Sequence, residues 1–199
     1  MAPVLSDGWT GRIVTTHTPD ILQDLTRRFG ASGQRLYPDG ADARIEAVDR
    51  FCEQDINAAA QRAGQSGTDM AARETALTAL LRGLGELERR LSSAQHVLGG
   101  ELSAADVRLW VTLVQLDTVQ RWHLDAAAVY RITGHPHLWS YARRLAAHPA
   151  FASHLDLDGI ARRHHAHCGG TEAAGAAVRI VDWASREPRS IAVVKATRN

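Results

Sequence analysis

The sequence predicts a mainly α-helical protein, and three observations carry that prediction. The stretch 103–120 is apolar on nearly every side of a helical wheel, so we expect it to be a central helix that is buried all round. Ser103 and Asp106 stand three residues apart at its start, which is the spacing of a capping box. Leucines recur at helical spacing over 77–91 and predict a second long helix.

The remaining elements follow in chain order. Residues 3–16 have the pattern of strand, turn and strand. Thr18 and Pro19 then start a helix as N-cap and first helical residue, and Gly30 ends it. Further helices are expected over 41–62, 68–91, 103–120, 137–147 and 157–167, with the segment 122–133 between them and irregular structure from 169 to 199.

The bulk numbers describe an ordinary globular chain. It has 199 residues, 45% of them apolar, and a net charge of +1, which gives no basic field for nucleic acid. No apolar run is long enough to span a bilayer, and the start lacks the pattern of a signal peptide. Cys52 and Cys168 do not form a disulfide framework, so we expect a cytoplasmic protein whose partner is a small molecule, not nucleic acid or a membrane.

Several motifs then fall in one order at the spacings of a known family. They are Pro3-Val4-Leu5, Thr10-Gly11-Arg12-Ile13-Val14, Leu36-Tyr37-Pro38, Ala104-Ala105-Asp106-Val107-Arg108-Leu109, His123-Leu124, Pro136-His137-Leu138-Trp139-Ser140-Tyr141 and Asp158-Gly159-Ile160. Over roughly residues 2–168 the sequence resembles the glutathionyl-hydroquinone reductases, the Xi-like class of the glutathione S-transferase superfamily.

The resemblance implies a glutathione S-transferase C-terminal-like helical bundle preceded by part of a thioredoxin-like domain. We expect a truncated thioredoxin-like remnant of hairpin plus helix over 1–32, a linker over 33–40, the all-α domain over 41–168 and an irregular tail over 169–199. The strand with the family's catalytic Cys-Pro motif is expected upstream of Met1.

Two positions in the first domain would contact glutathione if it is bound. Pro3 matches the family's cis-proline, so the resemblance implies a cis Ala2–Pro3 bond. The family's Glu-Ser pair, which holds the γ-glutamyl end of glutathione, falls on His17 and Thr18. Thr18 keeps a hydroxyl, whereas His17 cannot replace a carboxylate. We therefore expect no obligatory cofactor, with glutathione at Pro3 and Thr18 as the alternative.

The resemblance also points to a substrate cleft in the helical domain. Three tyrosines line the family's cleft, and this sequence has Gln61, Gln120 and one of His164 and His165 in their places. Amide side chains orient a substrate but do not transfer protons at ordinary pH. Imidazole titrates near neutrality, so His164 and His165 are the expected general acid and base.

Two further features leave alternatives open. His123 matches the family's histidine after the central helix, and it is either a catalytic group or a structural one bonded to backbone. Trp122 beside it either belongs to the core or flanks the cleft.

His164, His167 and Cys168 are candidate metal ligands, but the spacing supplies no partner pair elsewhere, so we expect no metal.

Three functions are consistent with these residues. The first is a thiol-independent enzyme, an isomerase, cyclase or lyase acting on an aromatic, quinoid or polyketide-like substrate, with catalytic His164, His165 and His123 and with substrate-binding Gln61, Gln120 and Trp122. The second is a transferase that depends on glutathione or another thiol. The third is a non-catalytic binding or assembly protein whose hairpin pairs with another chain. The first is our expectation, and a homodimer is compatible with it.

Overall fold

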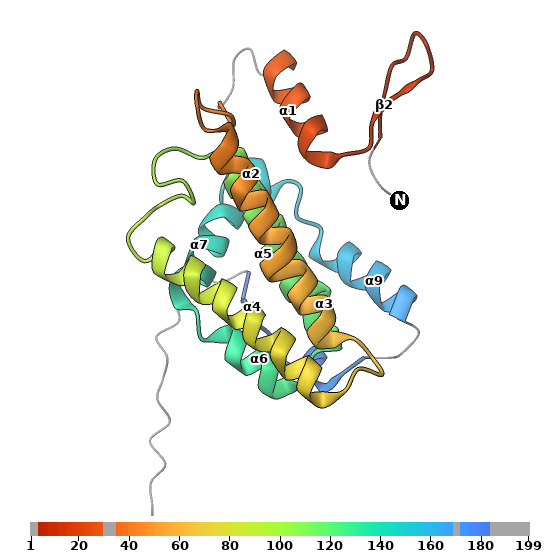
Figure 1. The fold of residues 1–199 in the computed structure, drawn as a ribbon, viewed down its shortest axis with the longest axis vertical. Coiled ribbons are helices and arrows are strands. Elements are labelled where there is room, and N and C mark those ends of the chain that lie inside the picture. Colours follow the sequence, from red (N-terminus) through yellow and green to blue (C-terminus); the bar gives the residue numbers. More distant parts are fainter. Residues whose placement is uncertain (1–3, 30–34, 169–171, 184–199) are drawn as a thin grey trace, which may run out of the picture.

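The structure, a computed structural model, describes residues 4–29, 35–168 and 172–183. A helical bundle forms the body, and a hairpin with one helix lies beside it (Figure 1), which confirms the mainly α fold class. In chain order the elements are β1 Leu5–Ser6, β2 Ile13–Thr15, α1 Thr18–Phe29, α2 Asp42–Phe51, the π-helical η1 Cys52–Asn57, α3 Ala58–Gly64, α4 Met70–Leu91, α5 Ala104–Thr118, the 3-10 helix η2 Gln120–His123, α6 Ala126–Thr133, α7 Pro136–Ala146, α8 Pro149–Ala152, α9 Leu157–Cys168 and the 3-10 helix η3 Ala174–Ala177.

The hairpin is the only sheet among the described residues. β1 and β2 are antiparallel, with Leu5 opposite Thr15 and Ser6 opposite Ile13. Gly11 closes the turn with a φ of 67°, a left-handed conformation that glycine adopts without steric cost. The expected strand, turn and strand are therefore confirmed.

The central helix α5 starts as its sequence predicts. The capping box of Ser103 and Asp106 is present, and the Ser103 hydroxyl also donates to the Asp106 carboxylate, 2.9 Å away. Leu109, Leu113 and Leu116 are fully buried on the core side. The expectation that this helix is buried all round is wrong, however, because Val111 is 37% exposed. That side of α5 faces a cavity, described below, that a neighbouring helix does not fill.

The helix expected over 41–62 is continuous, but it is not α-helical throughout. It widens to a π-helix over Cys52–Asn57 between α2 and α3. Gly83 of α4 lies very close to this π-helical segment. A Cβ on Gly83 would be 2.9 Å from the Ile56 side chain. Glycine at this position therefore lets α4 approach the π-helical segment closely.

Residues 172–183 lie in the stretch where the sequence predicts an irregular tail. Ile180 and Val181 are nevertheless buried in the core, 5% and 2% exposed. The Arg121 guanidinium donates to the carbonyls of Ala176 and Val178, at 2.6 and 2.8 Å. These contacts join the segment to η2, which follows α5.

The described residues include no helix that is both long and apolar enough to cross a membrane. The domain boundaries expected from the sequence stay predictions.

Candidate functional site

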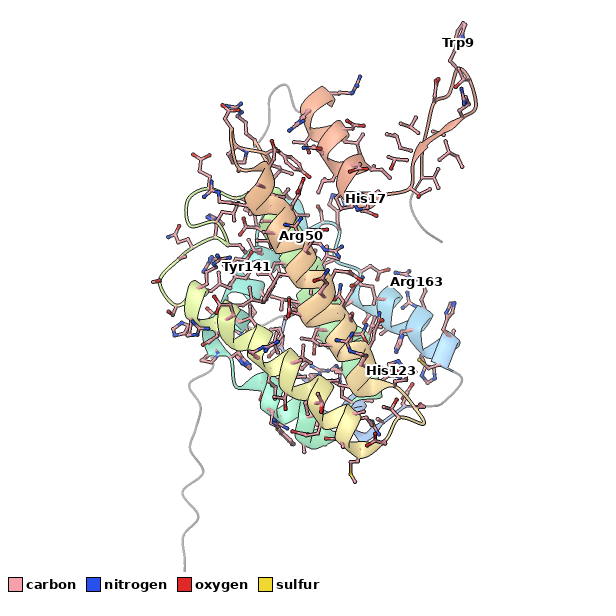
Figure 2. The ribbon with its side chains drawn as sticks, viewed as in Figure 1. Trp9, His17, Arg50, His123, Tyr141 and Arg163 are labelled. Atoms are coloured by element: carbon pink, nitrogen blue, oxygen red, sulfur yellow. The ribbon has the colours of Figure 1, made fainter. Side chains whose placement is uncertain are left out.

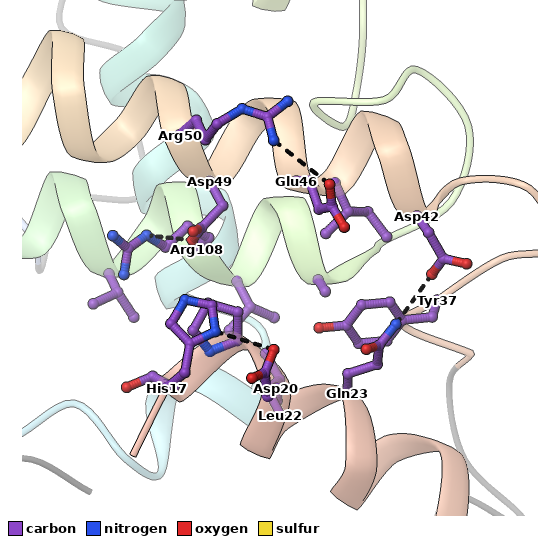
Figure 3. A pocket seen from close by; sticks show the side chains of 16 residues that line it. His17, Asp20, Leu22, Gln23, Tyr37, Asp42, Glu46, Asp49, Arg50 and Arg108 are labelled. Atoms are coloured by element: carbon purple, nitrogen blue, oxygen red, sulfur yellow. Dashed lines mark hydrogen bonds and ion pairs between the residues drawn. The ribbon is translucent and has the colours of Figure 1, made fainter. Parts of the chain in front are cut away.

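A cavity of about 340 Å³ lies between the start of α1 and the helices α2 and α5 (Figure 3). The loop before α2 completes it, since Leu36 accepts a hydrogen bond from the Ala104 amide at 2.8 Å and seats that loop on α5. The residues that line the cavity are His17, Thr18, Pro19, Asp20, Leu22, Gln23, Tyr37, Asp42, Ile45, Glu46, Asp49, Arg50, Ala104, Val107, Arg108 and Val111.

The cavity has an apolar side. Val107 and Val111 come from α5, Ile45 from α2 and Leu22 from α1. Val111 is the α5 residue that the sequence predicts to be buried and the structure leaves partly exposed. Apolar side chains at a concave surface favour binding of an apolar group, because burying them removes apolar surface from water.

Charged side chains of both signs line the rest of the cavity, and most of them are paired (Figure 3). Arg108 forms an ion pair with Asp49, with a nitrogen–oxygen distance of 2.9 Å. His17 and Asp20 lie 3.0 Å apart at the start of α1. Burial and the nearby Asp49 carboxylate raise the pKa of Tyr37, which keeps its hydroxyl protonated. An apolar surface with both charge signs beside it suits a small molecule that has an apolar part and a zwitterionic part.

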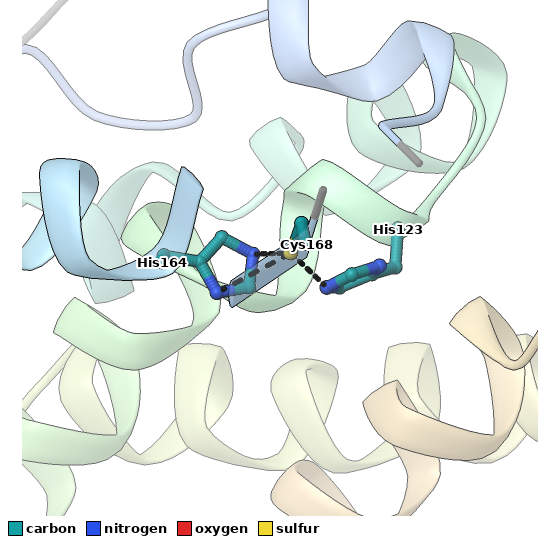
Figure 4. A group of neighbouring side chains, drawn as sticks. All are labelled: His123, His164 and Cys168. Atoms are coloured by element: carbon teal, nitrogen blue, oxygen red, sulfur yellow. Dashed lines mark hydrogen bonds between the residues drawn. The ribbon is translucent and has the colours of Figure 1, made fainter. Parts of the chain in front are cut away.

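A second group of side chains lies at the other end of the bundle, where η2 meets α9 (Figure 4). The Cys168 sulfur is 3.7 Å from His123 Nε2 and 3.2 Å from His164 Nε2. The rings of His123 and His164 are perpendicular, with centroids 5.0 Å apart. Trp122 makes edge contacts with both His164 and His165, at 5.8 and 6.2 Å.

The expected site residues thus separate into two places. Thr18 lines the cavity, whereas His123, His164, His165 and Trp122 gather at the η2–α9 end. The two glutamines do not line the cavity either: Gln61 is exposed on α3 and Gln120 begins η2. Pro3 and the expected cis Ala2–Pro3 bond lie outside the described residues.

Sequence reasoning missed two features of these sites. It did not pair His123 with Cys168, because the two residues are 45 positions apart and no local pattern links them. It also did not identify Arg108 and Asp49 as cavity residues. The sequence does indicate one half of the group at η2 and α9. His164 and Cys168 are four residues apart, which places them on one helical face.

The helical region matches a known family model. Residues 70–144 match the model of the glutathione S-transferase C-terminal domain. Glutathionyl-hydroquinone reductase YqjG of Escherichia coli K12 is 28% identical over 166 residues, covering 82% of this chain and 50% of the relative. Glutathionyl-hydroquinone reductase PcpF of Sphingobium chlorophenolicum is also 28% identical, covering 78% and 50%. The resemblance to the glutathione S-transferase superfamily is confirmed. The chain spans about half the length of these curated relatives.

Solved structures agree with this superfamily. The glutathione-bound structure of the glutathione transferase homologue YqjG from Escherichia coli K-12 has a TM-score of 0.75 and 26% identity, covering 96% of this chain and 62% of that one. The Xi-class transferase of Natrialba magadii has a TM-score of 0.78 at 23% identity, covering 96% and 60%, which shows a shared fold.

These relatives correct the function expected from the sequence. Thiol-independent isomerase, cyclase or lyase chemistry is contradicted, because the relatives are named for reactions of glutathionyl compounds and one is solved with glutathione bound. The replacement of the family's tyrosines by glutamine and histidine had suggested new chemistry. Three substituted positions are weaker evidence than similarity along four-fifths of the chain.

Proposed function

We propose that this chain functions in a glutathione-dependent transferase that acts on aromatic or quinoid compounds, and that glutathione binds in the cavity beside α1. One observation carries the proposal. Thr18, which the resemblance places at the γ-glutamyl end of glutathione, lines a cavity whose other walls are α2 and α5 of the helical domain. The names of the relatives, glutathionyl-hydroquinone reductases, support the same class of ligand.

The cavity offers a contact to each chemical part of such a ligand. The Thr18 hydroxyl at the first turn of α1 would donate to the γ-glutamyl carboxylate, near the positive end of the helix. Asp20, another residue of the cavity, would face the γ-glutamyl amino group. An aromatic second substrate would lie against Val107 and Val111.

The sulfur in this cavity would come from glutathione itself. Neither described cysteine lines it. Burial raises the pKa of Cys52 to about 11, so that thiol stays protonated near neutral pH and is a poor nucleophile. Cys168 lies with the histidines at the opposite end of the bundle.

Isothermal titration calorimetry with glutathione tests the proposal. We expect saturable binding by the purified chain, and we expect Thr18→Ala to weaken it about threefold to tenfold, the loss of one hydrogen bond. Thr75→Ala is the matched control, because Thr75 is exposed on α4 and its hydroxyl donates to the Ala71 carbonyl of its own helix. A glutathionylated hydroquinone, supplied with free glutathione as the reductant and tested for release of hydroquinone and glutathione disulfide, provides the activity assay.

Absence of heat and of a thermal shift at millimolar glutathione would reject the proposal, because a ligand of the native state stabilises it by mass action. Binding that Thr18→Ala and Thr75→Ala leave equally strong would place glutathione elsewhere than beside α1.

The homodimer and the cytoplasmic location expected from the sequence are proposals as well. The hairpin supports the first, because Trp9, Ile13 and Val14 are 96%, 66% and 58% exposed. Such apolar groups on a two-stranded sheet are suited to contact a second chain.

A further inference from the structure

Three potential metal ligands converge where η2 meets α9, far from the cavity that the proposed function uses. They are the imidazoles of His123 and His164 and the thiol of Cys168 (Figure 4). One ligand atom from each residue lies within 4.8 Å of the other two. All three side chains are partly buried, so they are neither freely solvated nor closed off from an entering ion.

The ligands come from two elements, α9 and η2, and each element is held in place by different contacts. His164 and Cys168 are four residues apart on α9 and therefore lie on one helical face. His123 ends η2, and its backbone is confined by α3: a Cβ added at Gly64 would be 2.7 Å from the His123 Cβ. Arg121, in the same turn as His123, is held by the carbonyls of residues 176 and 178. Fixed positions of this kind lower the entropy cost of assembling a site.

We propose that His123, His164 and Cys168 form a Zn²⁺ site with three protein ligands and one open coordination position. A tetrahedral zinc ion with Zn–S near 2.3 Å and Zn–N near 2.0–2.1 Å holds its sulfur and nitrogen ligands about 3.5 Å apart. The two sulfur–nitrogen distances here, 3.7 and 3.2 Å, lie on either side of that value. The sulfur also lies 3.8 Å from His164 Nδ1, so the His164 ring would turn to aim one nitrogen at the ion, and His123 would move slightly towards the sulfur.

The chemistry of the donors favours zinc over the other common divalent ions. Two imidazole nitrogens and one thiolate form a mixed, moderately soft set, whereas Mg²⁺ and Ca²⁺ prefer oxygen ligands. No carboxylate is part of the group that the described residues form.

The structure also explains why the sequence alone pointed to a different third ligand. His167 follows His164 by three residues, but its side chain is exposed and its Nδ1 lies 2.8 Å from the Arg163 carbonyl. His165 Nδ1 lies 2.5 Å from the Glu172 carboxylate instead of joining the group. The third ligand atom of the group comes from His123 of η2 instead.

The test uses the full chain without an affinity tag. After treatment with a chelator, we expect the protein to take up one equivalent of Zn²⁺ in competition with a chromophoric chelator. Cys168→Ser and His123→Ala should each weaken binding by about 100-fold or more, since even the loss of a group that only hydrogen-bonds to a metal ligand costs about 10–100-fold. His167→Ala is the matched control on the same helix and should bind as the unaltered chain does.

Cobalt(II) gives a second readout that a merely structural effect would not imitate. In the unaltered chain it should produce a near-ultraviolet thiolate-to-metal band, and Cys168→Ser should remove that band while circular dichroism still shows a folded helical protein. The proposal is overturned if zinc does not bind at one equivalent, if Cys168→Ser keeps the band, or if His167→Ala weakens binding as much as His123→Ala does.

Discussion

At the scale of single residues, Asp106 shows how one buried carboxylate can organise its surroundings. It is fully buried and accepts hydrogen bonds from the Val97 amide, from the amide and hydroxyl of Ser103 and from the Tyr141 hydroxyl, all at 2.8–2.9 Å. Burial, with the Asp106 charge beside it, raises the pKa of Tyr141 and keeps that phenol a donor. Figure 2 places Tyr141 within the body of the bundle.

Asp106→Ala should therefore lower the free energy of unfolding by about 3–5 kcal/mol, because it leaves several buried donors without an acceptor. Urea denaturation followed by circular dichroism measures the change. Asp39→Ala is the control: that side chain is 88% exposed, and its ion pair with Arg35 contributes under about 1 kcal/mol. A loss at Asp106 no larger than the loss at Asp39 would contradict this account of the helix start.

At the scale of elements, the end of α5 and the segment 172–183 hold each other in place. The Asp117 carboxylate accepts from the Ile180 amide at 3.1 Å and from the Trp183 indole at 2.8 Å. Arg121, one turn later, lies 3.3 Å from the same carboxylate. Burial raises the pKa of Asp117 in spite of these partners.

This raised pKa predicts a pH dependence of stability. The unfolded pKa is near 3.8 and the folded pKa is higher, so the folded state loses its proton at higher pH than the unfolded state does. Ionising Asp117 therefore costs folding free energy, and stability should fall as pH rises from 3.8 to the folded pKa, then stay level. Asp117→Asn should remove this fall. Urea titrations from pH 4 to 7 compare the two proteins, and a difference that grows in favour of the unaltered chain as pH rises would contradict the assignment.

At the scale of the whole molecule, the bundle and the hairpin differ in how well they are buried. The side chains of α4 and α5 fill the core, whereas Trp9 at the tip of the hairpin is 96% exposed (Figure 2). A two-stranded hairpin is only marginally stable in water without a surface to pack on. Between them, α1 contacts α2 through Asp42, which pairs with Arg27 at 3.0 Å.

Native-state hydrogen exchange should reveal this difference. We expect amides of α4 and α5 to exchange only through global unfolding and amides of residues 5–15 to exchange through local opening, at least about 100-fold faster. Mass spectrometry of peptic fragments measures both regions in one sample, with α7 as a second core reference. Hairpin protection equal to that of α5 would contradict the expectation and would favour pairing of the hairpin with another chain.

Local signals determined much of the fold. The capping box joins residues three apart, and the helix periodicity and the turn at Gly11 each depend on a few consecutive residues. The interactions that form these features are therefore all between residues close in sequence. The order of the hairpin and the longer helices could be predicted for the same reason, but α6, α8 and η3 were not predicted. The resemblance to the transferase superfamily came from motifs spread along the chain. The place of Thr18 at the start of α1 also followed from local sequence, whereas the structure was needed to show that this residue lines the cavity.

Only the tertiary structure decided where the remaining groups meet. Val111 looks like any core residue in the sequence, and its exposure depends on the space that α1 and α2 leave above α5. His123 and Cys168 come together across 45 residues, and Asp117 and Trp183 across 66. Such contacts depend on the packing of whole helices, whose energy is spread over many side chains and leaves no pattern in any short stretch of sequence.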